Sequence, residues 1–390
     1  MARRKFQLPG IHELSKEQED VRALPTDGQH LVIGGPGTGK SVLALLRSRR
    51  LHEEKVRYVF LVYNKLLHQA SRQLFGGQLS SHQWQSWFIG LYRKVTGALP
   101  PRLPAHGGGF WQPFDWQAIA DAVAETEVMN SADLPYLVID EGQDMPPSFY
   151  QVLANLGFEN FFVVADQNQQ ISPDENSTRK ELEDALGIET REVIELTKNY
   201  RNTLPIARLA QAFYTGDPAT PPPDLPQPSI VEAKKPLLYQ YPPERFKDVI
   251  RRMLKLADRH PAQLIGIIAP NNEVRTRYAA ALNNTPVQLD NGPPPVTTFA
   301  SGDQHTMRFD RGGIMVINAQ ACKGLEFDVV FIVDINQFHL NKTDVNVTKR
   351  LFYVMVARAT EQVIMLQEAG SRCAVEAILP QDPNILERKG

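Results

Sequence analysis

One stretch near the N-terminus constrains the fold more than any other. An apolar run at residues 31–33 stops in a glycine-rich turn, and apolar residues resume at Val42. Residues 34–41 between them read GGPGTGKS and fit the pattern G-x-x-x-x-G-K-[ST]. In such a turn, backbone N–H groups surround phosphate oxygens and the following helix N-terminus adds its positive end. The sequence therefore predicts a strand, a phosphate-binding loop and a helix.

The loop residues are expected to hold a nucleotide. Lys40 is expected to reach the β- and γ-phosphates, and Ser41 to ligate Mg²⁺. An ordinary glycine turn is the alternative, but the flanking strand and helix patterns speak against it. The residues assigned to nucleotide binding in this loop are Gly35, Pro36, Gly37, Thr38, Gly39, Lys40 and Ser41.

Apolar runs of strand length alternate with helical patterns along the rest of the chain. The expected strands beyond the loop are residues 58–63, 136–139, 161–165, 264–268, 314–317, 329–333 and 363–366. Alternation of this kind predicts parallel sheets with right-handed crossovers. We therefore expect an α/β protein with two doubly wound domains.

The expected domain boundary lies near Gly187, because residues 193–196 read as a new strand. The first domain is predicted to span 1–188 and to contain a small insertion at about 85–135. The aromatic residues around that insertion fit a satellite core, or a platform on which bases stack. The second domain is predicted to span 189–390, and its proline-rich stretch at 216–228 reads as a surface connection.

Composition sets further limits. The 390 residues are 42% hydrophobic, and no apolar run approaches the length of a membrane span. The basic start of the chain is followed by no hydrophobic signal core, so a cytoplasmic protein is expected. Cys322 and Cys373 suggest neither a disulfide framework nor a zinc site. The net charge of −2 neither supports nor excludes a polyanionic partner.

Two acidic residues follow the expected strand at 136–139. Asp140 is placed to hold Mg²⁺, and Glu141 could orient or deprotonate an attacking water. Hydrolysis also needs positive charge at the γ-phosphate, for which Arg201 and Arg358 of the second domain are the candidates. This set indicates an ATPase.

Two further patterns lie in expected helices, and the first of them leaves an alternative open. Gln18 fits a capping box with Ser15 at the start of a helix, but it could equally contact the adenine edge. The helix expected at about 244–260 has an apolar face and several basic residues, which read as a solvated face.

Taken in order, these motifs resemble those of superfamily 1 helicases of the UvrD/Rep type. The matching segments are Gln18, residues 34–41, 62–65, 81–84, 138–144, 165–169, 199–202, 323–328 and 351–359. The resemblance implies two tandem RecA-like domains of the P-loop NTPase fold, with ATP in the cleft between them and single-stranded nucleic acid across both.

The resemblance also implies residue roles. Gln18 would read adenine, Tyr200 would stack on it, Glu326 would contact the ribose, and Gln169 would sense the γ-phosphate. Arg201 and Arg358 would be arginine fingers. The nucleic-acid contacts implied by position are Tyr63, Asn64, His82 and Trp84, with Gln143 and Asp144 linking them to the ATP site.

The chain departs from the family pattern in places. The aromatic residue expected after Ile171 is Ser172, and the threonine expected before Arg358 is Ala357. The insertions that the family carries in each domain are short here, at about 85–135 and 284–312. The chain is therefore close to a minimal motor.

The expected activity is ATP-dependent translocation on single-stranded DNA, 3′ to 5′ by resemblance, with unwinding of short duplexes. RNA remains open as the track, because backbone tracking and base stacking serve both. The alternative is a DNA- or partner-stimulated ATPase subunit that senses or regulates a partner such as a nuclease in a defence or repair complex. A kinase or GTPase using the same loop would leave Tyr200 and Arg201 without a role.

Overall fold

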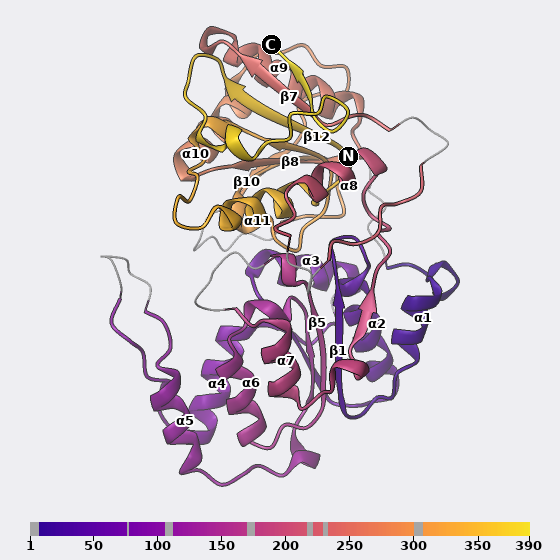
Figure 1. Ribbon diagram of the computed structural model, residues 1–390, viewed down its shortest axis with the longest axis vertical. Coiled ribbons are helices and arrows are strands. Elements are labelled where there is room, and N and C mark those ends of the chain that lie inside the picture. Colours follow the sequence, from indigo (N-terminus) through magenta and orange to yellow (C-terminus); the bar gives the residue numbers. More distant parts are fainter. Residues whose placement is uncertain are drawn as a thin grey trace. The chain divides into compact units, whose positions relative to one another are not determined.

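The computed structural model describes residues 8–75, 78–105, 112–169, 176–216, 221–228, 233–299 and 307–390. The chain forms two compact units (Figure 1). The first comprises Leu8–Gly34 and Lys40–Leu196, and the second comprises Gly35–Gly39 and Thr197–Gly390. Parts of the stretches predicted as insertions and as a proline-rich connection lie outside the described residues.

The first unit is built around a six-stranded parallel sheet in the order β3-β2-β4-β5-β1-β6. Its strands are β1 (Gln29–Gly34), β2 (Tyr58–Val62), β3 (Ser81–Gln83), β4 (Tyr136–Ile139), β5 (Phe161–Ala165) and β6 (Ile194–Leu196). Its helices are α1 (Lys16–Ala23), α2 (Lys40–Glu53), α3 (Lys65–Phe75), α4 (Trp84–Thr96), α5 (Trp116–Ala124), α6 (Pro147–Asn155) and α7 (Arg179–Leu186).

Successive strand residues point to opposite faces of this sheet, and helices cover both faces. Leu137 and Val163 face one core, which also holds apolar residues of α4, α5, α6 and α7. Val138 and Val164 face the other core, together with residues of α1, α2 and α3. Burial on both faces explains why these strands read as continuous apolar runs.

The described part of the predicted insertion is a pair of helices with an aromatic core. Trp84 packs edge-on against Phe149 with ring centroids 5.2 Å apart, and Phe88 packs against Phe114 at 5.5 Å. Trp116 lies against Phe88 at 5.2 Å. These rings therefore extend the core that Leu137 and Val163 form on one face of the sheet, and do not form a separate satellite core.

The second unit contains a seven-stranded parallel sheet in the order β13-β7-β12-β11-β8-β10-β9. Its strands are β7 (Leu237–Tyr241), β8 (Leu264–Ala269), β9 (Val296–Thr298), β10 (Gly313–Asn318), β11 (Phe327–Ile332), β12 (Ala359–Glu368) and β13 (Glu387–Lys389). Its helices are α8 (Leu204–Ala212), α9 (Phe246–Arg259), α10 (Asn272–Asn284) and α11 (Val345–Val356).

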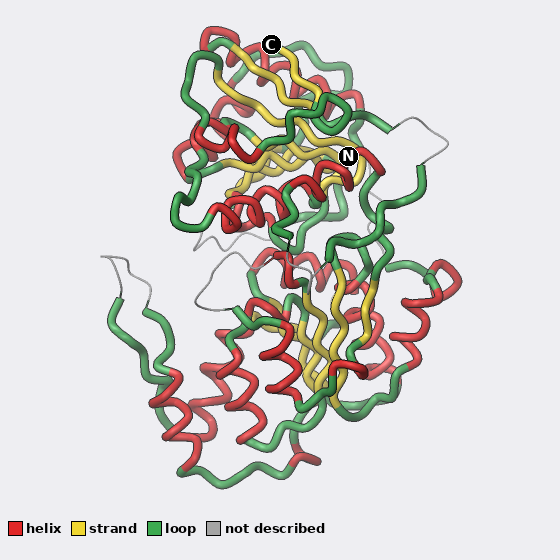
Figure 2. The backbone as a smooth tube through the Cα atoms, viewed as in Figure 1, coloured by secondary structure: helices red, strands yellow, loops and turns green. Residues whose placement is uncertain are grey.

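Within this unit α9 and α10 share one core with the sheet, formed around Ile265, Ile267, Val316 and Phe331. Helices α8 and α11 pack on each other, and both contact β12. Figure 2 shows the strands of each unit as a twisted layer with helices beside it. Two parallel sheets with interleaved helices confirm the predicted fold class.

The strand at the end of the first unit differs from the sequence expectation. Residues 193–196 were expected to open the second domain, whereas β6 pairs in parallel with β1, with Val32 opposite Ile194 and Gly34 opposite Leu196. A strand of three residues carries too little pattern to indicate which sheet it joins. Among the described residues, no helix is long and apolar enough to cross a membrane.

Candidate active site

The phosphate-loop backbone adopts conformations that require glycine. Gly37 and Gly39 have φ values of +79° and +93°, in the left-handed region that side chains disfavour. The backbone N–H of Tyr200 donates to the Gly37 carbonyl at 2.8 Å, inside the second unit. A Cβ atom on Gly37 would overlap Oδ1 of Asn199. At Gly37 the loop therefore has room for no side chain.

Lys40, the first residue of α2, meets the carboxylate that follows β5. Its Nζ lies 3.3 Å from Oδ2 of Asp166, and both side chains are buried in the first unit. The side-chain amide of Gln169 donates to the same carboxylate oxygen. Asp166 therefore holds together two residues that the sequence assigns to the γ-phosphate.

Ser41 meets Asp140, the residue that follows β4. The Ser41 hydroxyl donates to Oδ1 of Asp140 at 3.1 Å, and the backbone N–H of Glu141 donates to the same atom at 3.0 Å. Asp140 is only 1% exposed, and its Oδ2 has no hydrogen-bond partner among the described residues. Burial, together with the neighbouring Glu141, raises the pKa of Asp140 to about 7.

This arrangement fits Mg²⁺. A buried carboxylate whose second oxygen has no partner incurs a desolvation cost that a cation would offset. Carboxylate and hydroxyl oxygens are also the ligands that Mg²⁺ uses in phosphoryl-transfer sites. Asp140 and Ser41 are therefore the residues that would hold the ion.

Glu141 lies in the left-handed region with φ +57°. Its Oε2 accepts a hydrogen bond from the side-chain amide of Gln143 at 2.6 Å, and Oε1 of Gln143 accepts from the backbone N–H of Asp166 at 2.8 Å. Gln143 is fully buried. It fixes the Glu141 carboxylate relative to the ends of β4 and β5.

Gln18 forms the capping box that the sequence predicts as one of two alternatives. Its backbone N–H donates to the Ser15 hydroxyl at 3.3 Å, and its side-chain Oε1 accepts from the Ser15 backbone N–H at 3.0 Å. A role in reading adenine stays a prediction.

In the second unit, the segment after Thr197 contains an exposed tyrosine ring and an arginine that forms an ion pair. Tyr200 is 52% exposed. Arg201 pairs with the carboxylate of Glu326. Oδ1 of Asn199 accepts hydrogen bonds from the backbone N–H groups of Arg201 at 3.0 Å and Asn202 at 3.1 Å, so it fixes the turn that carries Arg201.

Arg358 directly precedes β12 and is 1% exposed. Its Nε donates to the carbonyl of Val354 at 3.1 Å, and its Nη1 lies 3.5 Å from the carbonyl of Leu325. The side-chain amide of Asn202 donates to the carbonyls on either side of Arg358, Ala357 at 3.2 Å and Ala359 at 2.6 Å. Asn202 thereby connects the segments that carry the two candidate arginine fingers.

The four predicted nucleic-acid contacts have different surroundings. His82 is exposed and Tyr63 is half-buried. Asn64 is also half-buried, and its Oδ1 accepts from the backbone N–H of Leu67 at 2.8 Å, so it caps α3. Trp84 is 2% exposed within the aromatic core.

The structure adds three residues to the site, none of which had been given a role in hydrolysis from the sequence. Asp166 contacts Lys40 and Gln169, Gln143 orients Glu141, and Asn202 holds the backbone beside Arg358. The signal for Asp166 was present, since it ends an apolar strand as Asp140 does. The resemblance pointed to Gln143 only as a link to the nucleic-acid contacts, and the amide of Asn202 carries no comparable signal.

Comparisons with known proteins agree with this geometry. A family model described as an AAA domain matches residues 17–174, and a model of the UvrD-like helicase C-terminal domain matches residues 313–366. No curated protein sequence matches the chain. A solved structure, the C-terminal domain of a possible DNA helicase from Lactobacillus plantarum WCFS1, is 18% identical. That match covers 48% of this chain and 97% of that one, with a TM-score of 0.33.

A phosphate loop at the start of a parallel sheet, with acidic residues after neighbouring strands, defines a P-loop NTPase with two tandem RecA-like domains. The AAA-domain match falls mainly in the first unit and also includes Gly35–Gly39 of the second, and the UvrD-like match falls in the second unit. Together the two matches support the resemblance to UvrD-like helicases that the order of the motifs predicts.

Proposed function

We propose that the protein hydrolyses ATP with Mg²⁺ and uses the reaction to move along single-stranded DNA. The observation that carries this proposal is the cluster at the ends of β4 and β5. There Lys40, Ser41, Asp140 and Glu141 lie together in the first unit. The family matches on both units support coupling to nucleic acid.

Each residue of the cluster has a distinct proposed role. Lys40 and the loop N–H groups bind the phosphates, and Glu141 accepts a proton from the attacking water. Mg²⁺ bound by Asp140 and Ser41 would neutralise charge on the β- and γ-phosphates. Gln169 senses the γ-phosphate, and Asp166 holds Lys40 and Gln169 in place.

The second unit is proposed to complete the reaction. ATP lies in the cleft between the two RecA-like domains, where Arg201 and Arg358 stabilise the charge of the transition state. Tyr200 stacks on the adenine, Gln18 reads its edge, and Glu326 contacts the ribose. Because Glu326 pairs with Arg201, binding of the nucleotide would exchange this ion pair for contacts to ATP.

The single strand is proposed to contact Tyr63, Asn64 and His82, with movement 3′ to 5′. Trp84, predicted as a fourth contact, is buried in the aromatic core, so we propose that it supports these residues without touching the strand. Stacking on exposed rings and backbone tracking suit any sequence of bases.

A second function has its own supporting observation. The described insertion is a helix pair whose aromatic residues turn inward. This favours an ATPase subunit that senses DNA or regulates a partner such as a nuclease. A strand-displacement assay of the isolated protein on a tailed duplex distinguishes the two functions. Clear unwinding would exclude a subunit that only senses DNA or regulates a partner.

The first test measures ATP hydrolysis with and without single-stranded DNA and RNA of matched length, at two salt concentrations. Lys40→Ala serves as the blank. Salt-sensitive stimulation by one polymer is expected, because phosphate contacts release counterions. Hydrolysis that neither polymer changes would contradict the proposed motor.

A further inference from the structure

A groove in the second unit lies outside everything assigned to ATP or to the single strand. It has a volume of about 370 Å³ and lies beside α9, over strands β7, β12 and β11. Its apolar lining comprises Leu237, Tyr239, Val249, Leu256, Phe331, Ile364 and Leu366. Val249 and Leu256 belong to α9, and the strand residues Tyr239, Phe331, Ile364 and Leu366 lie in the core that α9 and α10 share with the sheet.

The groove marks an incomplete layer. Parallel sheets are normally covered on both faces. Here α10 contacts β8, β9 and β10, whereas the groove leaves Leu237, Tyr239 and Ile364 only half-buried. A further helix beside α9 would complete the layer over β7 and β12.

Basic side chains border this apolar surface. Arg252, Lys255 and Arg259 lie three and four residues apart on α9, so they follow one side of the helix beside the groove. None of the three forms an ion pair with another described residue. The fourth cation of the lining, Lys389, pairs with Glu387 at 3.0 Å. In the part of the chain that the structure describes, no carboxylate lines the groove.

We propose that this groove binds an acidic amphipathic helix of a partner protein. Leucine-like side chains of the helix would occupy the apolar floor, and its glutamates or aspartates would face Arg252, Lys255 and Arg259. Helices that insert an apolar face into a groove are a common mode of recognition. The complementary charges would set partner choice and association rate.

The lining fits a peptide better than a nucleic acid. Single strands bind through bases stacked on open aromatic rings. Here the Tyr239 ring is covered by the Arg252 guanidinium, 5.4 Å from its centroid, and Phe331 is buried. The other apolar residues of the lining are aliphatic and offer no further ring on which a base could stack.

The test uses the full chain and a fluorescent helical peptide with leucines at every third or fourth position, flanked by glutamates. A second peptide carries lysines in place of the glutamates. The acidic peptide is expected to bind and the basic one is not. In R252E/K255E/R259E, binding of the acidic peptide should weaken by about tenfold or more, since three favourable charge pairs become repulsive.

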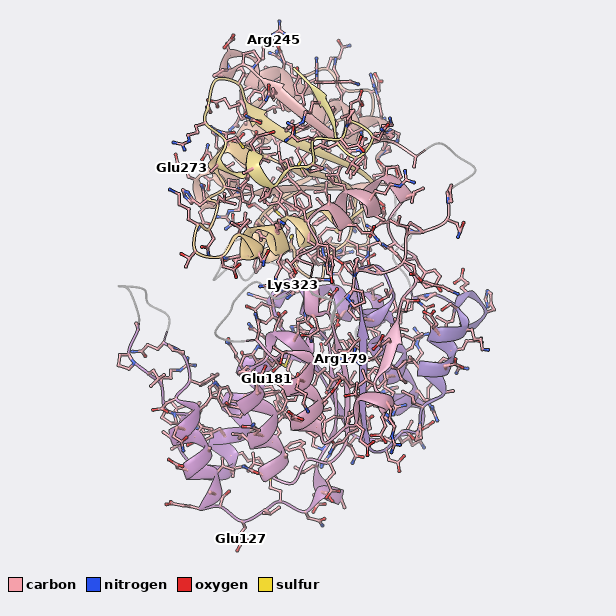
Figure 3. The ribbon with its side chains drawn as sticks, viewed as in Figure 1. Glu127, Arg179, Glu181, Arg245, Glu273 and Lys323 are labelled. Atoms are coloured by element: carbon pink, nitrogen blue, oxygen red, sulfur yellow. The ribbon has the colours of Figure 1, made fainter. Side chains whose placement is uncertain are left out.

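A matched control reverses three other cations near or on the same helix: R245E/K247E/R251E. These residues do not line the groove, and Arg245 projects outward at the start of α9 (Figure 3). The control has the same net charge and should bind the acidic peptide as the wild type does. Ile364→Gln should also weaken binding, which tests the apolar floor separately.

ATP hydrolysis should be unchanged in all of these variants, which shows that they are folded. Three results would overturn the proposal. The first is a wild type that does not bind the acidic peptide, and the second is equal binding of that peptide by both triple variants. The third is a groove variant that loses binding to single-stranded DNA, or loses self-association, and keeps peptide binding. That result would assign the groove to nucleic acid or to a second copy of this chain.

Discussion

The backbone at Glu141 holds a glutamate in the left-handed region, which costs about 1–3 kcal/mol for a residue other than glycine. The Gln143 amide fixes the carboxylate, and Gly142 next to it has no space for a side chain, because a Cβ there would overlap Val163. Conformational strain of this kind is concentrated at functional sites. The carboxylate is thus held in place before any nucleotide arrives.

Glu141→Gln removes the proposed proton acceptor and keeps the shape of the side chain. We expect ATP binding to persist while turnover falls by about 10²-fold or more, the range over which a general base acts. Single-turnover hydrolysis and nucleotide-binding assays measure the two effects separately. Glu127→Gln, at an exposed glutamate (Figure 3), is the control. Equal turnover in Glu141→Gln and wild type would remove Glu141 from the mechanism.

Asn202→Ala tests whether one buried amide positions the backbone beside Arg358. The variant leaves the carbonyls of Ala357 and Ala359 without this donor, so we expect a loss of about 1–3 kcal/mol in unfolding free energy. If Asn202 positions Arg358, turnover of the folded fraction should also fall while the KM for ATP stays constant. Asn283→Ala, which removes a bond within α10, is the control.

At the level of elements, α1 allows the two roles of Gln18 to be separated. Gln18→Glu preserves the capping box, because glutamate also accepts from the Ser15 backbone N–H. We expect the melting temperature to be retained and the preference for ATP over GTP to decrease. Ser15→Ala should do the reverse, losing about 1 kcal/mol of stability with unchanged nucleotide preference. Retained preference in Gln18→Glu would limit Gln18 to capping.

Much of the architecture was predictable because buried parallel strands have uninterrupted apolar sequences. The strands at β1, β2, β4, β5, β8, β10, β11 and β12 were all expected within a few residues. The acids after β4 were expected at a sheet edge because parallel strands deliver their C-terminal residues there. Because Lys40 and Ser41 also lie at that edge, the contacts Lys40–Asp166 and Ser41–Asp140 can form there.

The sequence missed short or polar elements. Strands β3, β7, β9 and β13 escaped the prediction because three to five residues, several of them polar, give no clear period. β6 was assigned to the wrong sheet, since pairing with β1 is a long-range property. The roles of Gln143 and Asn202 also depend on segments that meet only after folding.

At the level of the whole molecule, hydrolysis is expected to need both units. Arg358→Ala should lower turnover by about 10³-fold, as loss of an arginine finger does. ATP binding should change much less, because the phosphate loop is intact. Steady-state turnover corrected for the folded fraction measures the effect, with the exposed Arg372→Ala as control. Normal turnover in Arg358→Ala would mean that the second unit does not complete the site.

The position of β6 bears on how the chain is synthesised. β1 emerges from the ribosome early, yet its neighbours β5 and β6 are made more than a hundred residues later. Until residue 196 has been translated, one edge of β1 lacks its partner and can pair with other chains. A gene fragment that stops at the end of α7 would therefore produce an aggregation-prone protein. In a fragment that extends past β6, that edge of β1 would be paired.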